Sequence, residues 1–337
     1  MKVLLTGGAG YIGSHTAVEM IAAGHEVVII DSLVNSKASV IGRIEEIAGS
    51  TVSFHEFDIA DARRLAAVCS AEDVEAVVHF AGLKAVGESV SNPLRYYQAN
   101  LTTSMSLAGV MQALAIRHLV FSSSATVYGE PERIPLDENC RATEAANPYG
   151  RTKIMIEQML RDIQAASPAL NIALLRYFNP AGAHPSGRIG EDPTGIPNNL
   201  VPFVTQVALG LRDELVIHGD DYPTPDGTCI RDYIHVQDLA RGHVAALNKL
   251  TGNCGLVTYN LGTGRGHSVK EVVSAFERAT NQHLKQRVGP RREGDVPVSY
   301  TDPTLAKTEL GWSATHSMDD ICQDAWRWQD QNPTGYP

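Results

Sequence analysis

The feature that most constrains this chain is a run of glycines near its start, Gly7-Gly8-Ala9-Gly10-Tyr11-Ile12-Gly13. It lies between the apolar segment 2–6 and the segment 12–23, whose apolar spacing predicts a helix that ends before Gly24. Glycine lets a backbone turn tightly and approach a pyrophosphate closely, and the amides of a helix N-terminus bind the negative charge. The run therefore predicts a dinucleotide site, unless the glycines serve only a structural turn.

Further apolar runs at 26–30, 52–57, 76–81, 118–122 and 169–178 alternate with segments of helical pattern. Such runs are typical of parallel strands buried on both faces, so we expect an α/β fold with a doubly wound, parallel, Rossmann-type sheet. The stretch 179–199 is rich in Gly, Pro and Asn and predicts a long functional loop. We therefore expect a dinucleotide-binding domain over 1–178 and a smaller mixed α/β substrate domain over 179–337, with the chain free to cross back.

A carboxylate at the end of the second predicted strand supports the dinucleotide site. Asp31 follows the run 26–30 and lies 24 residues after Gly7. Its oxygens can accept both hydroxyls of an adenosine ribose and would repel a 2′-phosphate, which favours NAD over NADP. The alternative for Asp31 is a solvated strand end. Asp58 has two interpretations, contact with the adenine or the N-cap of a helix over 60–68.

A serine-rich strand end and a tyrosine–lysine pair predict the place of the chemistry. The fifth strand leads into Ser122-Ser123-Ser124, and open α/β sheets bind ligands at the carboxyl ends of their strands. A helix predicted over 149–166 places Tyr149 and Lys153 four residues apart on one face. A nearby ammonium group and a positive nicotinamide ring favour the phenolate of a tyrosine, whose ordinary pKa is about 10.

Composition and charge exclude several classes of protein. The chain has 28 Lys and Arg against 38 Asp and Glu, a net charge of −10, which argues against a general nucleic-acid partner. No apolar run approaches the ~18 residues that cross a bilayer, and the N-terminus lacks a signal-peptide pattern. The five cysteines are scattered without C-x-x-C spacing, so neither a disulfide framework nor a metal site is expected. We expect a cytoplasmic protein without a membrane partner.

Over essentially its whole length, the chain resembles the extended short-chain dehydrogenase/reductase superfamily, and within it the UDP-galactose (UDP-glucose) 4-epimerases. The resemblance rests on the residues above and on five further segments in the family's order. These are HFAGLKAVGES at 79–89, LRYFNP at 175–180, GIPNNL at 195–200, RDYIHV at 231–236 and RREGD at 291–295.

The resemblance implies an epimerase with tightly bound NAD. Tyr149 would take the proton of the sugar 4-hydroxyl while the C4 hydride passes to the nicotinamide, and Ser124 would hydrogen-bond the 4-oxygen. Lys153 would bind the nicotinamide ribose and lower the pKa of Tyr149. The 4-keto sugar would then rotate and take the hydride back on its other face. The family is commonly homodimeric, and helices at 94–111 and 149–160 are the candidate interface.

The resemblance also assigns binding residues. Cofactor contacts are expected from Gly7, Gly10, Tyr11, Ile12, Gly13, Asp31, Asn35, Ser36, Asp58, Ile59, Phe80, Ala81, Lys84, Asn100, Ser122, Tyr149, Lys153, Tyr177 and Phe178. Substrate contacts are expected from Ser124, Tyr149, Asn179, Asn198, Asn199, Leu200, Val216, Ile217, His218, Arg231, Tyr233, Arg292, Asp295 and Ser299. Three alternatives stay open: Arg231 as a partner of Asp232, Arg292 as a solvated charge, and Lys84 as a surface lysine.

Two rival functions and one refinement complete the expectations. A nucleotide-sugar 4,6-dehydratase would need an Asp–Glu pair after Ser124, where this chain has Ala125-Thr126. A non-catalytic NAD-binding sensor would need neither Tyr149 nor Lys153. In the family, a small residue four places after Asp295 accompanies activity on N-acetyl sugars, and a bulky tyrosine accompanies its absence. Ser299 therefore predicts turnover of UDP-GlcNAc and UDP-GalNAc as well, unless Tyr300 fills the space.

Overall fold

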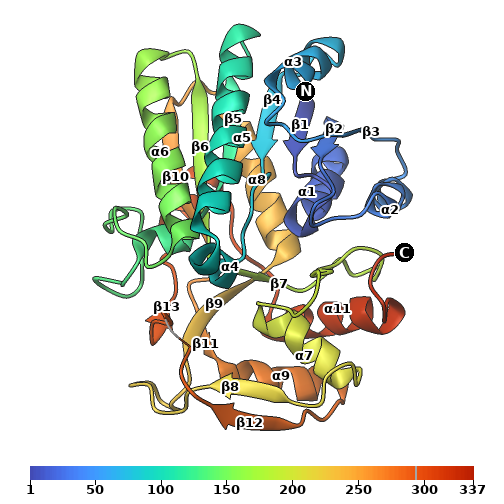
Figure 1. Cartoon of the computed structure of the whole chain (residues 1–337), viewed down its shortest axis with the longest axis vertical. Helices are drawn as coiled ribbons and strands as arrows, with labels where there is room; N and C mark the ends of the chain where they lie inside the picture. Colours follow the sequence, from blue (N-terminus) through green and yellow to red (C-terminus); the bar gives the residue numbers. More distant parts are fainter. Residues whose placement is uncertain (293) are drawn as a thin grey trace.

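Seven parallel strands form the central sheet of the computed structural model, which describes residues 1–292 and 294–337 (Figure 1). Glu293, inside the RREGD segment, lies outside the described residues. The strand order is β10-β6-β5-β4-β1-β2-β3. The strands are β1 (Lys2–Thr6), β2 (Glu26–Asp31), β3 (Ser53–Glu56), β4 (Ala76–His79), β5 (His118–Ser124), β6 (Asn171–Tyr177) and β10 (Leu256–Leu261). The predicted doubly wound Rossmann-type sheet is confirmed.

Helices cover both faces of this sheet because successive strand residues are apolar on both sides. Val3 and Leu5 face one core, together with α1 (Tyr11–Ala22), α2 (Ser39–Ala48) and α8 (Val236–Leu250). Leu4 faces the other core, together with α3 (Ala62–Ala71), α5 (Pro93–Ala113) and α6 (Pro148–Ala166). The short helix α4 (Val86–Ser91) precedes α5, and α10 (Thr304–Leu310) packs beside β10.

A smaller unit is built around β9 (Ile230–His235), below the main sheet in Figure 1. Parallel strands β7 (Asn179–Ala181) and β13 (Val298–Ser299) and antiparallel β11 (Gly266–Ser268) all pair with β9. Strand β8 (Leu215–His218) pairs in parallel with β12 (Gln286–Gly289). Helices α7 (Leu200–Ala208), α9 (Val269–Thr280) and α11 (Met318–Gln331) pack around a common apolar cluster with these strands. The mixed α/β character expected for this part is present.

The chain passes several times between the two units. Strand β10 returns from the second half of the sequence to pair with β6, and α8 returns with it to cover the sheet. In the other direction, the C-terminal residues reach α2, where the Arg43 guanidinium lies 4.9 Å from the centre of the Tyr336 ring. The sheet unit therefore contains segments from both halves of the sequence.

Two sequence expectations differ locally from the structure. The helix expected at 60–68 begins at Ala62, and its N-cap is Asp61, whose side chain accepts from the Arg64 amide at 3.0 Å. Asp58 is therefore not the N-cap; it accepts from the Ala60 amide in the preceding turn. The long loop expected at 179–199 contains the short strand β7, because Asn179–Ala181 pairs with β9.

Within the described residues, no helix is long and apolar enough to cross a membrane. Nor does any group of three or more His, Cys, Asp or Glu side chains in this part of the chain form a metal site.

Three histidines are buried in the sheet unit and held neutral. The His15 Nδ1 donates to the Tyr11 carbonyl oxygen at 2.7 Å, and His79 lies between the hydroxyls of Thr6 and Ser104. His243 on α8 contacts the hydroxyl of Tyr177. Burial lowers the pKa of His15 and His79 to about 3 and that of His243 to about 4.

These histidines predict a steep loss of stability in mild acid. The unfolded chain binds three protons below its histidine pKa of about 6.5, while the folded chain does not bind them until pH 3–4. The free energy of unfolding should therefore fall as the pH drops below about 6.5, by up to ~4 kcal/mol per pH unit. Urea unfolding between pH 7 and 5 measures this slope. His79→Gln should reduce it by the share of one histidine, about 1.4 kcal/mol per pH unit. Substitution of the exposed His283 should leave it unchanged, and equal slopes in all three proteins would refute the explanation.

Candidate active site

The glycine loop between β1 and α1 forms a cradle that no larger residue could line. Gly7 has φ +69°, and a Cβ there would lie 2.8 Å from the amide nitrogen of Ala81 at the end of β4. A Cβ at Gly13 would lie 2.5 Å from the Gly7 carbonyl oxygen. Gly10 is the N-cap of α1 and offers no side chain to the helix amides. The first turn of α1, with Tyr11 and Ile12, therefore fits a bound pyrophosphate, because its amides lack side-chain partners.

Asp31 is fixed at the edge of this cradle. Its carboxylate accepts from the amides of Ala9 at 3.0 Å and Leu33 at 2.9 Å, and from the Ser36 hydroxyl at 2.8 Å. A carboxylate offers about four acceptor positions, so one remains for a ribose hydroxyl. The alternative of a solvated strand end does not fit, because Asp31 is 9% exposed. Asn35 is exposed in the adjoining turn.

The third and fourth strands end beside the same cradle. Asp58 is exposed, whereas the Ile59 side chain is buried in the core, so only the Ile59 backbone can face a ligand. The amides of Phe80 and Ala81 both donate to the Thr6 carbonyl, at 2.9 and 3.0 Å, which joins β4 to the glycine loop.

Asn100 on α5 holds the loop that carries Lys84. Its Oδ1 accepts from the Leu83 amide at 2.7 Å, and its Nδ2 donates to the Leu83 carbonyl and to the Thr152 hydroxyl on α6. The Asn100 side chain is thus engaged within the protein and fixes the loop, and its expected contact with the cofactor stays a prediction. Lys84 Nζ forms an ion pair with Glu191 at 3.1 Å, so Lys84 is not an isolated surface lysine.

Tyr149, Lys153 and Ser124 come together at the carboxyl end of β5. Asn147 caps α6 by accepting from the Gly150 amide at 2.9 Å, and this cap sets the start of the helix at Pro148, one residue before Tyr149. Lys153 is 5% exposed; its Nζ donates to the Ser122 carbonyl at 2.7 Å and lies 5.9 Å from the centre of the Tyr149 ring. The Tyr149 hydroxyl is in hydrogen-bonding contact with Ser124.

The pKa values of these groups shift in opposite directions, and burial is the main cause of each shift. Burial raises the pKa of Tyr149, and the hydrogen bond with Ser124 opposes the rise. Burial lowers the pKa of Lys153 to about 8, and the Glu157 carboxylate opposes that fall. Burial also raises the pKa of Tyr177, whose hydroxyl contacts Ser122 and His243. The pocket therefore favours neutral groups until a further positive charge enters it.

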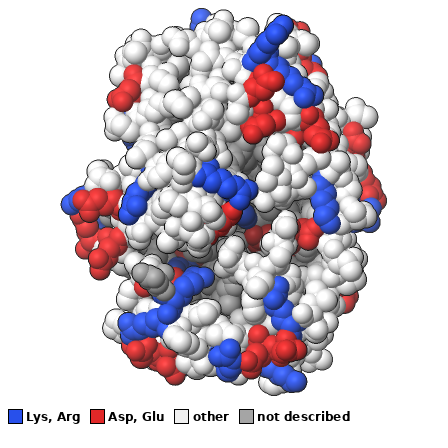
Figure 2. Space-filling view, viewed as in Figure 1, with Lys and Arg blue, Asp and Glu red and all other residues white. Residues whose placement is uncertain are grey.

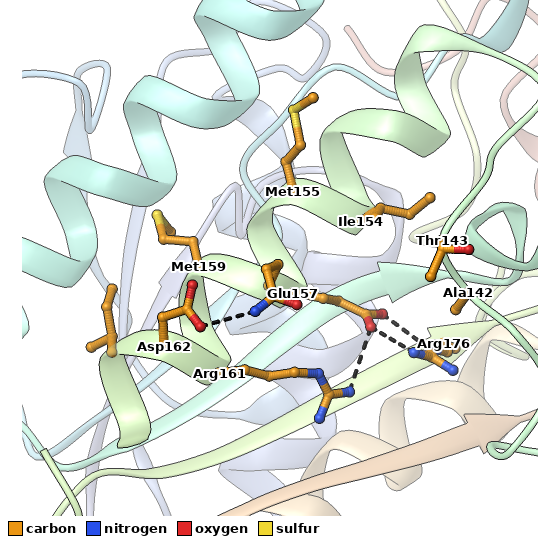
Figure 3. A pocket seen from close by; sticks show the side chains of 11 residues that line it. Ala142, Thr143, Ile154, Met155, Glu157, Met159, Arg161, Asp162 and Arg176 are labelled. Atoms are coloured by element: carbon orange, nitrogen blue, oxygen red, sulfur yellow. Dashed lines mark hydrogen bonds and ion pairs between the residues drawn. The ribbon is translucent and has the colours of Figure 1, made fainter. Parts of the chain in front are cut away.

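A buried ion pair that the sequence did not reveal supports this triad. Glu157, one turn after Lys153, binds Arg176 of β6 through two hydrogen bonds of 3.0 and 2.6 Å (Figure 3). Glu157 also accepts from the Ser123 hydroxyl at 2.6 Å, and Arg176 donates to the Tyr128 hydroxyl at 3.0 Å. Tyr149, Lys153 and Glu157 follow one another at intervals of four residues, and this spacing could have placed Glu157 on the same helix face.

Two of the expected diphosphate ligands share one carboxylate across the smaller unit. Asp295 accepts from Arg231 at 3.4 Å and from Arg292 at 3.0 and 3.1 Å. The alternative pairing of Arg231 with Asp232 is wrong, because Asp232 instead accepts from Thr263, Gly264 and Thr301. Arg292 is likewise paired with Asp295, although its side chain is 57% exposed. The molecular surface is hollowed between the two units, with Lys and Arg side chains beside the hollow (Figure 2).

The remaining expected substrate residues fall into three groups. Asn179, Arg231 and Tyr233 lie on the paired strands β7 and β9, and Ser299 of β13 is in register with Arg231. Asn198 and Asn199 are exposed in the loop before α7, and Leu200 begins that helix. Val216 and His218 are accessible on β8, while Ile217 is buried in the core with its side chain away from solvent. Phe178, an expected cofactor residue, is buried against Tyr128 and Leu136.

Comparisons with known proteins agree with this geometry. Residues 3–262 match the model of the NAD dependent epimerase/dehydratase family. The UDP-glucose 4-epimerase of Bacillus subtilis (strain 168) is 53% identical over 336 residues, covering 100% of this chain and 99% of that protein. The structure of UDP-glucose-4-epimerase from Stenotrophomonas maltophila, with bound NAD and formylated UDP-arabinopyranose, is 52% identical, with a TM-score of 0.97 over 99% of each chain.

A more distant structure, the UDP-Glc/GlcNAc 4-epimerase of Campylobacter jejuni, is 37% identical, with a TM-score of 0.85 over 98% of this chain and 99% of that chain. These matches extend over the sheet unit and the smaller unit alike. The chain belongs to the NAD dependent epimerase/dehydratase family.

The buried ion pair gives a stability prediction. Glu157→Ala leaves the Arg176 guanidinium, 4% exposed, without its anion, so the free energy of unfolding should fall by about 3–5 kcal/mol. The matched control is Glu46→Ala, which breaks an ion pair with Arg188 whose side chains are about half exposed and should cost less than about 1 kcal/mol. Urea unfolding of both variants measures the difference, and similar losses would contradict the assignment.

Proposed function

We propose that this chain is a UDP-glucose 4-epimerase, which interconverts UDP-galactose and UDP-glucose through a 4-keto sugar. The observation that carries the proposal is the meeting of Tyr149, Lys153 and Ser124 at the end of β5, beside the glycine cradle. Sequence identity of 53% over the whole chain to an enzyme of that name supports the same activity.

The cradle fits NAD as the resident cofactor. Gly7, Gly10 and Gly13 leave room for a pyrophosphate, and Asp31 offers a carboxylate to the adenosine ribose, which favours NAD over NADP. Lys84 stands beside Tyr11 at the mouth of the cradle. NAD, when bound, supplies a hydride acceptor and a positive charge in the pocket.

Tyr149 is the general base and acid for the sugar 4-hydroxyl. Its raised pKa in the protein alone means that the phenolate needs added positive charge, which the Lys153 ammonium provides in part. Lys153 is held in place by the Ser122 carbonyl, and Ser124 donates or accepts a hydrogen bond at the reacting oxygen. Ala125 and Thr126 follow Ser124 in a 3₁₀ turn and bring no carboxyl group for a dehydration step.

The grip on the substrate comes from the smaller unit. Arg231 and Arg292 suit the diphosphate, and Asp295, held between them, suits a ribose hydroxyl. The working division is therefore NAD binding by 1–178 with the returning segments, and UDP-sugar binding by 179–337. A homodimer through α5 and α6 and a cytoplasmic location belong to the same proposal.

Tyr149→Phe tests the proposal directly. Loss of a general base typically costs about 10²–10⁴-fold in kcat, while affinity for UDP should stay close to that of the wild type. Tyr259→Phe is the control, because Tyr259 lies on β10 and donates to Glu309 away from the pocket. The measurements are UDP-galactose turnover without added NAD and the absorbance of reduced cofactor after UDP-sugar addition. A Tyr149→Phe enzyme with more than half the activity would refute the role.

We extend the proposal to N-acetyl sugars because of the geometry around Ser299. Ser299 pairs with Arg231, so its small side chain shares a face with an expected substrate ligand. Tyr300 points to the opposite face, where its ring lies against Gly266, so it does not fill the space beside Ser299. The Campylobacter jejuni enzyme shows that this fold accommodates both sugar types in one named protein.

The extension predicts that the wild-type enzyme turns over UDP-GlcNAc as well as UDP-galactose. Ser299→Tyr should abolish the first activity, because the ring meets the acetamido group as the keto sugar rotates, and should spare the second. Ser299→Ala is the size-matched control and should keep both activities. Kinetics on both sugar pairs decide the matter: absence of UDP-GlcNAc turnover in the wild type ends the extension without touching the main proposal.

A further inference from the structure

One carboxylate, that of Glu191, lies at the seam between the cradle and the smaller unit. It belongs to the connection between β7 and α7, and its side chain is 10% exposed. Glu191 Oε1 accepts from Lys84 Nζ at 3.1 Å and from Asn199 Nδ2 at 2.9 Å. Lys84 is an expected cofactor ligand and Asn199 an expected substrate ligand, so Glu191 touches one residue from each site.

The backbone at Glu191 is rigidly placed. The Trp328 indole donates to the Glu191 carbonyl at 3.1 Å, and a Cβ at the preceding Gly190 would lie 2.3 Å from the Trp328 ring. The Tyr336 hydroxyl bonds both the amide and the carbonyl of Gly190, at 3.0 and 3.1 Å. A carboxylate on so fixed a support can orient mobile partners rather than follow them.

Each partner of Glu191 is in a position that needs such orientation. The Lys84 side chain is 59% exposed, and without an anion it would sample many rotamers, yet its Nζ is held 5.9 Å from the Tyr11 ring at the start of α1. Asn199 is the N-cap of α7, but its side chain makes no capping bond and donates to Glu191 instead. Asparagine at this position ordinarily caps its own helix, so Glu191 draws it away from the helix.

The second carboxylate oxygen of Glu191 also supports an orienting role. Glu191 Oε2 is buried and has no hydrogen-bond partner among the described residues. A buried anionic oxygen without a partner is costly in a folded protein, so its retention indicates a role beyond stability. Glu191 also lies close enough to Tyr11 to raise the pKa of that hydroxyl, after the larger effect of burial.

We propose that Glu191 is a positioning residue that orients Lys84 toward the cofactor and Asn199 toward the UDP-sugar, and so links the two sites. The proposal rests on the function proposed above. Two variants separate the two contacts. Glu191→Ala removes both, while Glu191→Gln keeps an oxygen that can accept from Asn199 but loses the charge that holds Lys84.

The test uses the purified holoenzyme, with UDP and the bound NAD as probes. Glu191→Ala should weaken UDP binding about three- to tenfold, the range of one hydrogen bond, and should speed the loss of NAD during gel filtration. Glu191→Gln should lose NAD equally fast but bind UDP within about twofold of the wild type. The control is Asp192→Asn, whose carboxylate contacts Lys37 and the Tyr336 amide rather than Lys84 or Asn199; it should change neither quantity.

A double-mutant cycle gives the decisive outcome. Asn199→Ala should weaken UDP binding in the wild type and have little further effect in Glu191→Ala, because Asn199 has already lost its orienting acceptor. Fully additive losses, unchanged NAD retention in both variants, or a Glu191→Gln enzyme that loses UDP affinity as Glu191→Ala does would overturn the inference. A wild-type protein that carries no NAD and binds no UDP would instead refute the proposed function, and with it the inference.

Discussion

The ion pair between Glu157 and Arg176 is the interaction on which the geometry of the pocket depends. It joins α6, which carries Tyr149 and Lys153, to β6, and through the Ser123 hydroxyl it also joins α6 to β5. Two charges in the interior are tolerated only because every strong donor has an acceptor there. The same carboxylate opposes the fall in the pKa of Lys153, so the group that joins α6 to β6 also favours the ammonium form of the lysine.

A second carboxylate, that of Asp232, joins the strands of the smaller unit. It is fully buried and accepts from Thr263, Gly264 and Thr301, which brings β10, β11 and β13 to one strand. Ser299 lies two residues before Thr301, so the buried bond between the Thr301 amide and Asp232 helps to set its place beside Arg231. Residues in the pocket can therefore vary without loosening the frame that presents them.

Much of this arrangement could be predicted because it depends on local pattern. Strand, glycine loop and helix follow one another in the first 23 residues, and the four-residue spacing of Tyr149 and Lys153 places both on one helix face. What could not be predicted depends on contacts between distant residues. The hydrogen bonds of Asn100 to Leu83 and Thr152 are one example, and Asp58 was weighed as a cap that Asp61 provides one turn later. Neither Glu157 nor Glu191 shows its partners in the sequence, because these lie 19 and 107 residues away.

Because β10 returns from the second half of the chain to complete the sheet, the first 178 residues do not contain the whole sheet. All seven residues of β6 are buried, and β10 covers the outer edge of that strand. A chain that stopped at residue 178 would expose an apolar edge of unpaired amides and carbonyls, which is a template for aggregation. The half that holds the dinucleotide cradle is therefore not a separable module. Gene fragments and domain fusions that divide the chain there would yield insoluble material, and recombination can exchange the substrate unit only together with the strand that completes the sheet.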